Sequence, residues 1–253
     1  MKLINSNEEL QWPYFYLCSM TISRYLLILL LICCGGMLRA QQTYVGLSGG
    51  THINGAYIEH SLRGSEYNTV VVQQPLVGFH AGVQARYYNE VKDFRKIHSG
   101  IGGGLYYFQR GLKQDFFLVE SPVTRMNYLQ IPIEALLFVG STENRFYLKL
   151  GVFTEFLLSY SLPEAPADSL IIIEDFYTYD PDRGDRKFGY GGSAGLGFHK
   201  TSGKQSFDLN VFFSYALSNF IYTNRIADPT PDTSNFWSAG LQFNYMIPFL
   251  RSD

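Results

Sequence analysis

The stretch Asn127-Tyr128-Leu129-Gln130-Ile131-Pro132-Ile133-Glu134-Ala135-Leu136-Leu137-Phe138-Val139 alternates two kinds of side chain. One face is entirely apolar and carries Leu129, Ile131, Ile133, Ala135, Leu137 and Val139. The other face is mixed and carries Tyr128, Gln130, Pro132, Glu134, Leu136 and Phe138. A period of two is typical of a β-strand whose faces meet different surroundings. The stretch is longer than the roughly five or six residues of a soluble strand, and it suits a tilted membrane-crossing strand of about 9–11 residues.

Seven further segments repeat this alternation, at residues 43–50 (with an extension to 58 left open), 76–88, 97–108, 145–158, 188–199, 207–217 and 236–247. Long connections are expected at 59–75, 109–127, 159–187 and 219–235, and short ones at 89–96, 140–144 and 200–205. Short turns at one end and long loops at the other are typical of membrane barrels. The sequence therefore predicts an all-β fold, an eight-stranded antiparallel up-and-down transmembrane β-barrel.

The apolar faces are nearly free of charge, whereas the opposite faces are rich in glycine and carry isolated polar residues. Lipid contact demands the first pattern, and a narrow lumen suits the second. The predicted lumen residues are His80, Gln84, Arg86, His98, Gln130, Glu134, Lys149, Glu155, Asp208, Asn210, Gln242 and Asn244. Because buried charges need partners, Arg86, Glu134, Lys149 and Glu155 are candidates for a charge network. A secreted soluble β-barrel or sandwich, with the apolar faces packed inside, is the alternative.

The N-terminal region has the features of an export signal. Arg24 is followed by a ten-residue apolar run, Tyr25 to Cys34, and then by Ala40 and Gln41. A basic residue, a short apolar run and a small residue predict a signal peptide over residues 20–40, cleaved between Ala40 and Gln41. Residues 1–19 look unlike a signal and are interpreted as a start-site extension, so the barrel domain is expected at 41–253. A membrane anchor that is retained is the other interpretation.

Composition narrows the functional classes. The chain has 253 residues, 17% of them charged and 16% aromatic, with a formal net charge of −2. That balance argues against a nucleic-acid partner, whose binding surface would be basic. The three cysteines, Cys18, Cys33 and Cys34, all precede the predicted cleavage point, so the mature chain would hold no disulfide. No cofactor is predicted, because the glycines at 100–104 are followed by neither a Lys-Ser/Thr pair nor a helix signal.

Individual polar residues are interpreted mainly as lumen filling. His80, His98 and His199 share the predicted inner face, but a metal site needs three or four converging ligands, and no metal is predicted. The acidic segment 164–185 lacks EF-hand spacing and is interpreted as a solvated loop. No catalytic residue is assigned, although His80 and Ser193 within hydrogen-bond reach of an acid would favour an enzyme. Pro132 lacks a ladder donor, so a local irregularity of the sheet is expected there.

Tyr128-Leu129-Gln130-Ile131-Pro132-Ile133 resembles the Y-L-E-I-P-L strand of the PorT-like outer-membrane β-barrel family of Bacteroidetes. The segments 45–50, after a leader ending in Ala-Gln, and 213–219 are also similar to that family, and the resemblance covers about residues 41–249. Gln130 stands where the family usually has Glu, and the chain ends at Asp253 instead of on an aromatic residue. The resemblance implies an outer-membrane location and no single activity.

Three functional classes follow from these observations. An eight-stranded barrel has an interior that side chains fill, so an open porin is not expected. The first hypothesis is a non-enzymatic structural or interaction protein that uses its long loops. The second is a membrane-embedded hydrolase, and the third is a narrow conduit or a component of a protein-secretion assembly. Expected partners are outer-membrane lipid, the barrel-assembly machinery, and an envelope or secretion protein.

Overall fold

The computed structural model of the chain describes residues 42–59, 72–88, 97–115, 123–141, 143–161, 179–182, 184–203, 205–222 and 233–251. The chain divides into two units, Met1–Ala40 and Gln41–Asp253, and every described residue belongs to the second. The predicted start-site extension, signal peptide and cleavage point at Ala40 and Gln41 lie outside the described residues. The strands are β1 (Gln42–Glu59), β2 (Val72–Gln74), β3 (Leu76–Tyr88), β4 (Ile97–Asp115), β5 (Val123–Gly140), β6 (Asn144–Ser161), β7 (Phe188–Ser202), β8 (Gln205–Ala216) and β9 (Thr233–Arg251).

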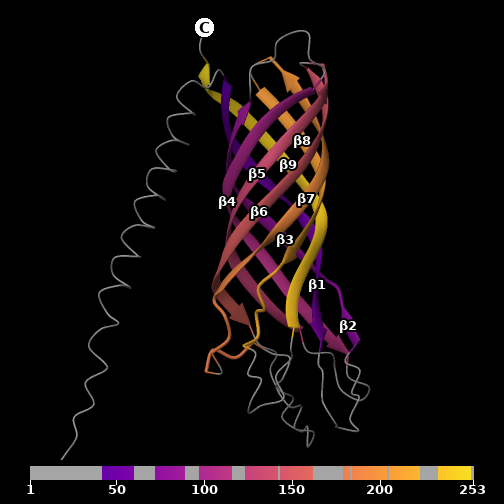
Figure 1. The fold of residues 1–253 in the computed structure, drawn as a ribbon, viewed down its shortest axis with the longest axis vertical. Coiled ribbons are helices and arrows are strands. Elements are labelled where there is room, and N and C mark those ends of the chain that lie inside the picture. Colours follow the sequence, from indigo (N-terminus) through magenta and orange to yellow (C-terminus); the bar gives the residue numbers. More distant parts are fainter. Residues whose placement is uncertain are drawn as a thin grey trace, which may run out of the picture. The chain divides into compact units, whose positions relative to one another are not determined.

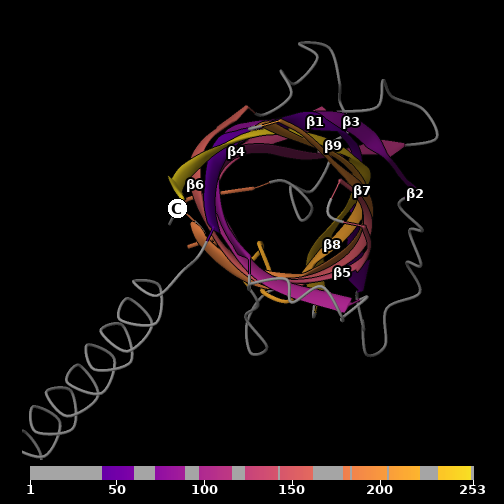
Figure 2. The same cartoon turned by 90° about the horizontal axis from the view of Figure 1, so that it is seen from above.

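The eight long strands form a closed ring (Figures 1 and 2). Each pairs antiparallel with two neighbours in the order β1-β3-β4-β5-β6-β7-β8-β9, and β9 pairs with β1 to complete the ring. The three-residue β2 pairs with β4 and is separated from β3 by Pro75, so it extends the β3 side of the wall. The predicted eight-stranded up-and-down barrel is confirmed.

The strand register determines how wide the barrel is. Following paired residues around the ring from Val45 in β1 through every other long strand leads back to β1 at Gly55, ten residues further along. Such an offset requires the strands to tilt against the barrel axis, as Figure 1 shows. With eight strands this geometry leaves an interior that side chains can fill.

The outer face of the barrel is apolar. Leu47, Ile133 and Leu196, on three different strands, are 64%, 63% and 66% exposed. The polar residues that alternate with such apolar residues along the strands face inward. In the soluble alternative these apolar side chains would pack against each other inside, so that alternative is wrong. The outward apolar residues of β5 run from Leu129 to Val139, which at about 3.3 Å per residue and a tilt of about 40° gives roughly 25 Å along the barrel axis. That height matches the apolar band of outer-membrane barrels.

Aromatic side chains flank the apolar band at both ends. At the short-turn end two outward pairs have ring centroids 5.3 Å and 5.2 Å apart, Phe146–Phe198 and Phe207–Tyr245. At the loop end the corresponding pairs are 5.5 Å and 5.0 Å apart, Phe79–Tyr107 and Phe156–Phe188. Aromatic residues favour the two membrane–water interfaces because their rings combine apolar and polar character.

The ladder is irregular at Pro132, as predicted, but only on one side. Between β4 and β5, the pairing runs from Ile97 to Gly103 opposite Ile133, and it resumes at Tyr106 opposite Gln130 with the register unchanged. The ladder to β6 continues through Pro132 opposite Phe153. The missing N–H of proline therefore interrupts the sheet locally without a bulge.

Other irregularities were not anticipated. Bulges lie between Thr43 and Tyr44 and between Asn127 and Tyr128. The β3–β4 ladder ends at His80 opposite Phe108, and pairing to β4 resumes only in β2, with Gln74 opposite Lys113. Residues 76–79 therefore have no ladder partner in β4. Extra residues of this kind increase twist and are frequent at the rims of barrels.

Several strands are longer than the sequence suggested. β4 continues to Asp115 and β5 begins at Val123, so the expected loop 109–127 is much shorter. β1 extends to Glu59, β6 to Ser161, and β9 starts at Thr233. These extensions continue past the apolar band, where the alternation of apolar and polar residues fades. At the other end, β7 and β8 are joined by a tight turn in which Gly203 has φ of +62°, a conformation that favours glycine. The described residues contain no helix with the length and apolarity needed to cross a membrane.

Candidate functional site

The barrel interior gathers the polar residues that the sequence singled out. All of these residues are buried, with exposures between 0% for Asn244 and 8% for His98: His80, Gln84, Arg86, His98, Gln130, Glu134, Lys149, Glu155, Asp208, Asn210, Gln242 and Asn244. Each lies on a strand of the ring, on the face opposite the lipid-facing apolar residues. The lumen is therefore the candidate site, because the polar and charged side chains singled out from the sequence lie there together.

Three ion pairs lie in the lumen, one between neighbouring strands and two between strands that are not neighbours in the ring. Lys149 Nζ lies 3.0 Å from Glu134 Oε1, in the adjacent β5, while its second contact, 2.9 Å to Gln242 Oε1, reaches β9. Arg110 NH2 lies 3.0 Å from Glu155 Oε2.

Arg86 pairs with Asp208, which also accepts a bond from His199 Nδ1. Of these three pairs, Lys149–Glu134 joins neighbouring strands and the other two span the interior. The four charged residues predicted to form one network thus divide among separate pairs, and Glu155 is paired with Arg110.

Apolar clusters close the interior at both ends. At the short-turn end Tyr88, Leu136, Phe138, Tyr147 and Met246 form one buried cluster. At the loop end a second cluster contains Ala56, Leu112, Met126, Tyr128, Phe153, Tyr179, Ala216, Phe220, Ile221 and Phe236. Glycines make room for the large rings, since a Cβ at Gly197 would lie 2.5 Å from Tyr147 and one at Gly191 would lie 2.5 Å from Phe153. The polar middle of the lumen is therefore enclosed between two apolar layers.

Residues 217–222, of which 219–222 were expected in a loop and 217 in the preceding strand, take part in the seal at the loop end. Phe220 stacks on Phe236 with ring centroids 4.2 Å apart, and Ile221 is fully buried. The backbone N–H of Phe220 donates to Ser234 O, and that of Ile221 donates to Ser234 Oγ. Asp185 accepts from the N–H of Tyr222 at 2.7 Å. These bonds hold the segment, which we call the cap, against the start of β9.

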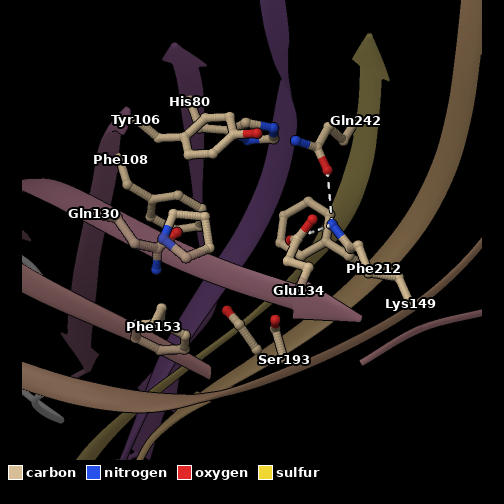
Figure 3. Close-up of a pocket in the computed structure, with 12 residues that line it drawn as sticks. His80, Tyr106, Phe108, Gln130, Glu134, Lys149, Phe153, Ser193, Phe212 and Gln242 are labelled. Carbon is tan, nitrogen blue, oxygen red and sulfur yellow. Dashed lines mark hydrogen bonds and ion pairs between the residues drawn. The ribbon is translucent and has the colours of Figure 1, made fainter. Parts of the chain in front are cut away.

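A small cavity of about 30 Å³ lies in the polar middle (Figure 3). Its lining includes Lys149 between Glu134 and Gln242, with Phe212 5.8 Å from the ammonium. Four lining atoms have no hydrogen-bond partner among the described residues: His80 Nε2, Gln130 Nε2, Ser193 Oγ and Ser214 Oγ. The volume suits one or two water molecules, and no larger ligand fits it.

The tautomers of His52 and His80 follow from their contacts. His52 Nε2 lies 2.8 Å from Gln109 O, a carbonyl that can only accept, so Nε2 carries a proton. In a neutral His52, Nδ1 is then the acceptor for His80 Nδ1, 3.2 Å away. His80 Nε2 is consequently an acceptor facing the cavity, while Gln130 Nε2 is a donor. The cavity therefore offers both donors and acceptors, as water requires.

The arrangement that would favour an enzyme is not formed. His80 and Ser193 line the same cavity, but no hydrogen bond joins them, and Glu134 is engaged by Lys149. The histidines His80 and His199 are each held in separate contacts, with His52 and with Asp208. Across the residues that the structure describes, no group of three or more His, Cys, Asp or Glu side chains could hold a metal ion.

Sequence reasoning missed two lumen residues with major roles. Arg110 was assigned to a loop because the alternation was followed only to residue 108, yet it is fully buried and pairs with Glu155. His52 lies in the part of the first strand whose extension was left open. Continuing the period of two beyond Phe108 and Gly50 would have placed both residues on the inner face.

A closed ring of antiparallel strands with an apolar outer band and a polar, filled interior defines a transmembrane β-barrel. The profile of the family described as "Outer membrane protein beta-barrel domain" matches residues 39–222. The chain belongs to this family, which indicates the bacterial outer membrane as its location. No curated protein matches the sequence.

Several solved structures are similar to this chain. OprG from Pseudomonas aeruginosa has 12% identity and a TM-score of 0.42, with 84% of this chain and 98% of that chain covered. Neisserial surface protein A has 15% identity and a TM-score of 0.41, covering 82% and 97%. The attachment invasion locus protein Ail of Yersinia pestis, in complex with the heparin analogue sucrose octasulfate, has 13% identity and a TM-score of 0.36, covering 81% and 99%.

Proposed function

We propose that this chain is a non-enzymatic outer-membrane scaffold whose filled, rigid barrel presents its long loops to a partner. The observation that carries this proposal is the lumen itself, in which ion pairs and apolar clusters occupy the interior from end to end. Buried polar groups that are paired and packed specify one arrangement. A barrel of this kind holds its loop ends at fixed positions, which suits recognition better than transport.

Ion conductance distinguishes the scaffold proposal from the competing hypothesis that the barrel is a conduit. The purified barrel, folded and reconstituted into planar bilayers, is expected to give no stepwise current, while a porin reconstituted in the same way does. The buried apolar layers around Phe138 and Phe236 would obstruct a hydrated path for ions. Discrete, reproducible current steps from the wild-type barrel would contradict the scaffold proposal and favour the conduit.

The partner experiment uses the tagged full-length protein in its native outer membrane. We expect a stoichiometric protein to co-purify with it. We also expect replacement of residues 162–178 and 223–232 by Gly-Ser linkers of equal length to abolish that co-purification while the barrel still folds. Folding is checked by the heat-dependent shift in gel mobility. If the linker variant retains the partner, the loops do not form the binding surface.

The finer identity is also part of this proposal. The Tyr128–Ile133 motif supports a place among PorT-like barrels. The apolar run after Arg24 supports export by a signal peptide cleaved between Ala40 and Gln41, followed by insertion through the barrel-assembly machinery. We infer that the short turns face the periplasm and the long loops the exterior. N-terminal sequencing of the mature protein tests the cleavage site, and a start upstream of Tyr25 would contradict it.

A further inference from the structure

Beyond the apolar band, the outer wall of β4, β5 and β6 carries a connected row of polar side chains at the loop end. Gln109, Asn127 and Ser159 are direct neighbours in the strand register. Gln109 Nε2 donates to Asn127 Oδ1 at 3.3 Å, and Asn127 Nδ2 donates to Ser159 Oγ at 2.9 Å. We call these three residues the amide row.

The register shows where the amide row lies relative to the membrane. The row next to it on the membrane side is formed by Tyr107, Leu129 and Phe156, which are paired in the same way. Tyr107 and Phe156 belong to the aromatic residues at the loop end of the apolar band. Because such rings sit at headgroup level, the amide row lies where hydrocarbon gives way to polar headgroups.

Two cations stand on this wall immediately beyond the amide row. Arg125 is paired with Gly111, and Lys113 with Val123, so they are diagonal neighbours on adjacent strands, a separation of about 7–8 Å. Arg125 uses NH1 to donate to Gln109 Oε1 at 3.3 Å, and because its side chain is exposed, its other N–H donors are accessible from outside the barrel. The amide row thereby fixes the position of the guanidinium.

The basic side chains in the lumen and those on the outer wall have different neighbours. Arg86, Arg110 and Lys149 each meet a carboxylate inside the barrel. Among the outward side chains of β4, β5 and β6 that the structure describes there is no carboxylate beside Arg125 or Lys113; the side chain of Asp115, at the end of β4, lies outside these described side chains. A balancing anion at headgroup level would come from the lipid, and a phosphate matches both the planar guanidinium and a nearby ammonium.

We propose that Arg125 and Lys113 bind the phosphate monoester headgroup of a lipid in the leaflet at the loop end, with the amide row positioning Arg125. Outward donors beside an aromatic row would hold the phosphate while its acyl chains lie along the apolar residues below. The site would anchor a particular class of lipid to one side of the barrel and set its height in the membrane.

The test uses the folded full-length barrel in detergent and dioleoyl phosphatidic acid as the probe, with lipid retention measured by native mass spectrometry. The Lys113→Gln/Arg125→Gln variant is expected to lower the apparent affinity roughly 25-fold, because each basic residue near an anionic lipid contributes about fivefold. Dioleoyl glycerol, which lacks the phosphate, should not be retained. The control Lys187→Gln/Lys200→Gln removes two exposed charges elsewhere and should retain the lipid as the wild type does.

Three results would overturn the site. The double variant could retain phosphatidic acid unchanged, the control could lose it equally, or dioleoyl glycerol could be held as well as phosphatidic acid. Gel mobility before and after heating confirms that each variant is folded, so a loss of lipid is not a loss of structure.

Discussion

His52 of β1 hydrogen-bonds Gln109 of β4 although β3 lies between these two strands. Its Nε2 is 2.8 Å from Gln109 O, and Asn54 Nδ2 reaches the same oxygen at 3.3 Å. Both side chains pass beneath Gly78, in the part of β3 that has no ladder partner in β4. The two side chains therefore satisfy a carbonyl that the interrupted ladder leaves unpaired, and a buried carbonyl without a partner would be costly.

The first prediction concerns Gly78. A Cβ there would lie 2.6 Å from both Gln109 O and Asn54 Nδ2 and 2.9 Å from His52 Nε2, so Gly78→Ala should displace both side chains. We expect a loss of about 1–3 kcal/mol in the free energy of unfolding, measured by urea titration in detergent micelles. Gly49→Ala is the matched control, because its Cβ would approach only His80 O, at 3.5 Å. Equal effects of the two changes would contradict the crossing arrangement.

The second prediction concerns Arg110 and Glu155, whose side chains are both almost fully buried. Arg110→Met alone or Glu155→Leu alone leaves one uncompensated charge in the lumen and should cost about 3–5 kcal/mol of unfolding free energy. The double variant removes both charges and should recover most of that loss. A double-mutant cycle from urea titrations measures the coupling, and additive losses would show that the pair is not coupled.

The third prediction tests which face meets lipid. Ile133 lies in the middle of the outward apolar run of β5 and Val139 at its end, and both side chains are well exposed. Ile133→Arg should cost about 2–4 kcal/mol of folding free energy in lipid bilayers, whereas Val139→Arg should cost about 0–1 kcal/mol because it lies near the interface. Equilibrium folding into phosphatidylcholine vesicles gives both values. A similar cost at the two depths would argue against the assigned membrane position.

The fourth prediction concerns the cap at the loop end. Ser234 accepts two backbone donors, with its carbonyl from Phe220 and with its Oγ from Ile221. Ser234→Ala removes only the second bond and leaves a buried N–H without a partner. Hydrogen exchange at Ile221 should then become at least tenfold faster, while exchange in the middle of β7, for example at Ala194, stays unchanged. Unaltered exchange at Ile221 would mean that the bond does not hold the cap.

Prediction from the sequence was most accurate within the apolar band, where successive residues alternate between the lipid face and the lumen face. Ile133 and Glu134 are adjacent in the chain, and one is 63% exposed while the other is buried. The alternation of side chains gives this outcome directly, because a strand in a barrel wall has one face in lipid and one in the lumen. This alternation weakens past the band, which explains why the ends of β4 and β5 and the buried role of Arg110 were missed.

The sequence by itself determined the number of long strands and the face that each of their residues takes, since both depend on local periodicity. Only the tertiary structure decided which lumen side chains meet. Arg86 and Asp208 are 122 residues apart and on strands that are not neighbours, and their encounter depends on the register with which the ring closes. The register around the ring is the sum of the offsets between all pairs of neighbouring strands, and the sequence of one strand does not contain that sum.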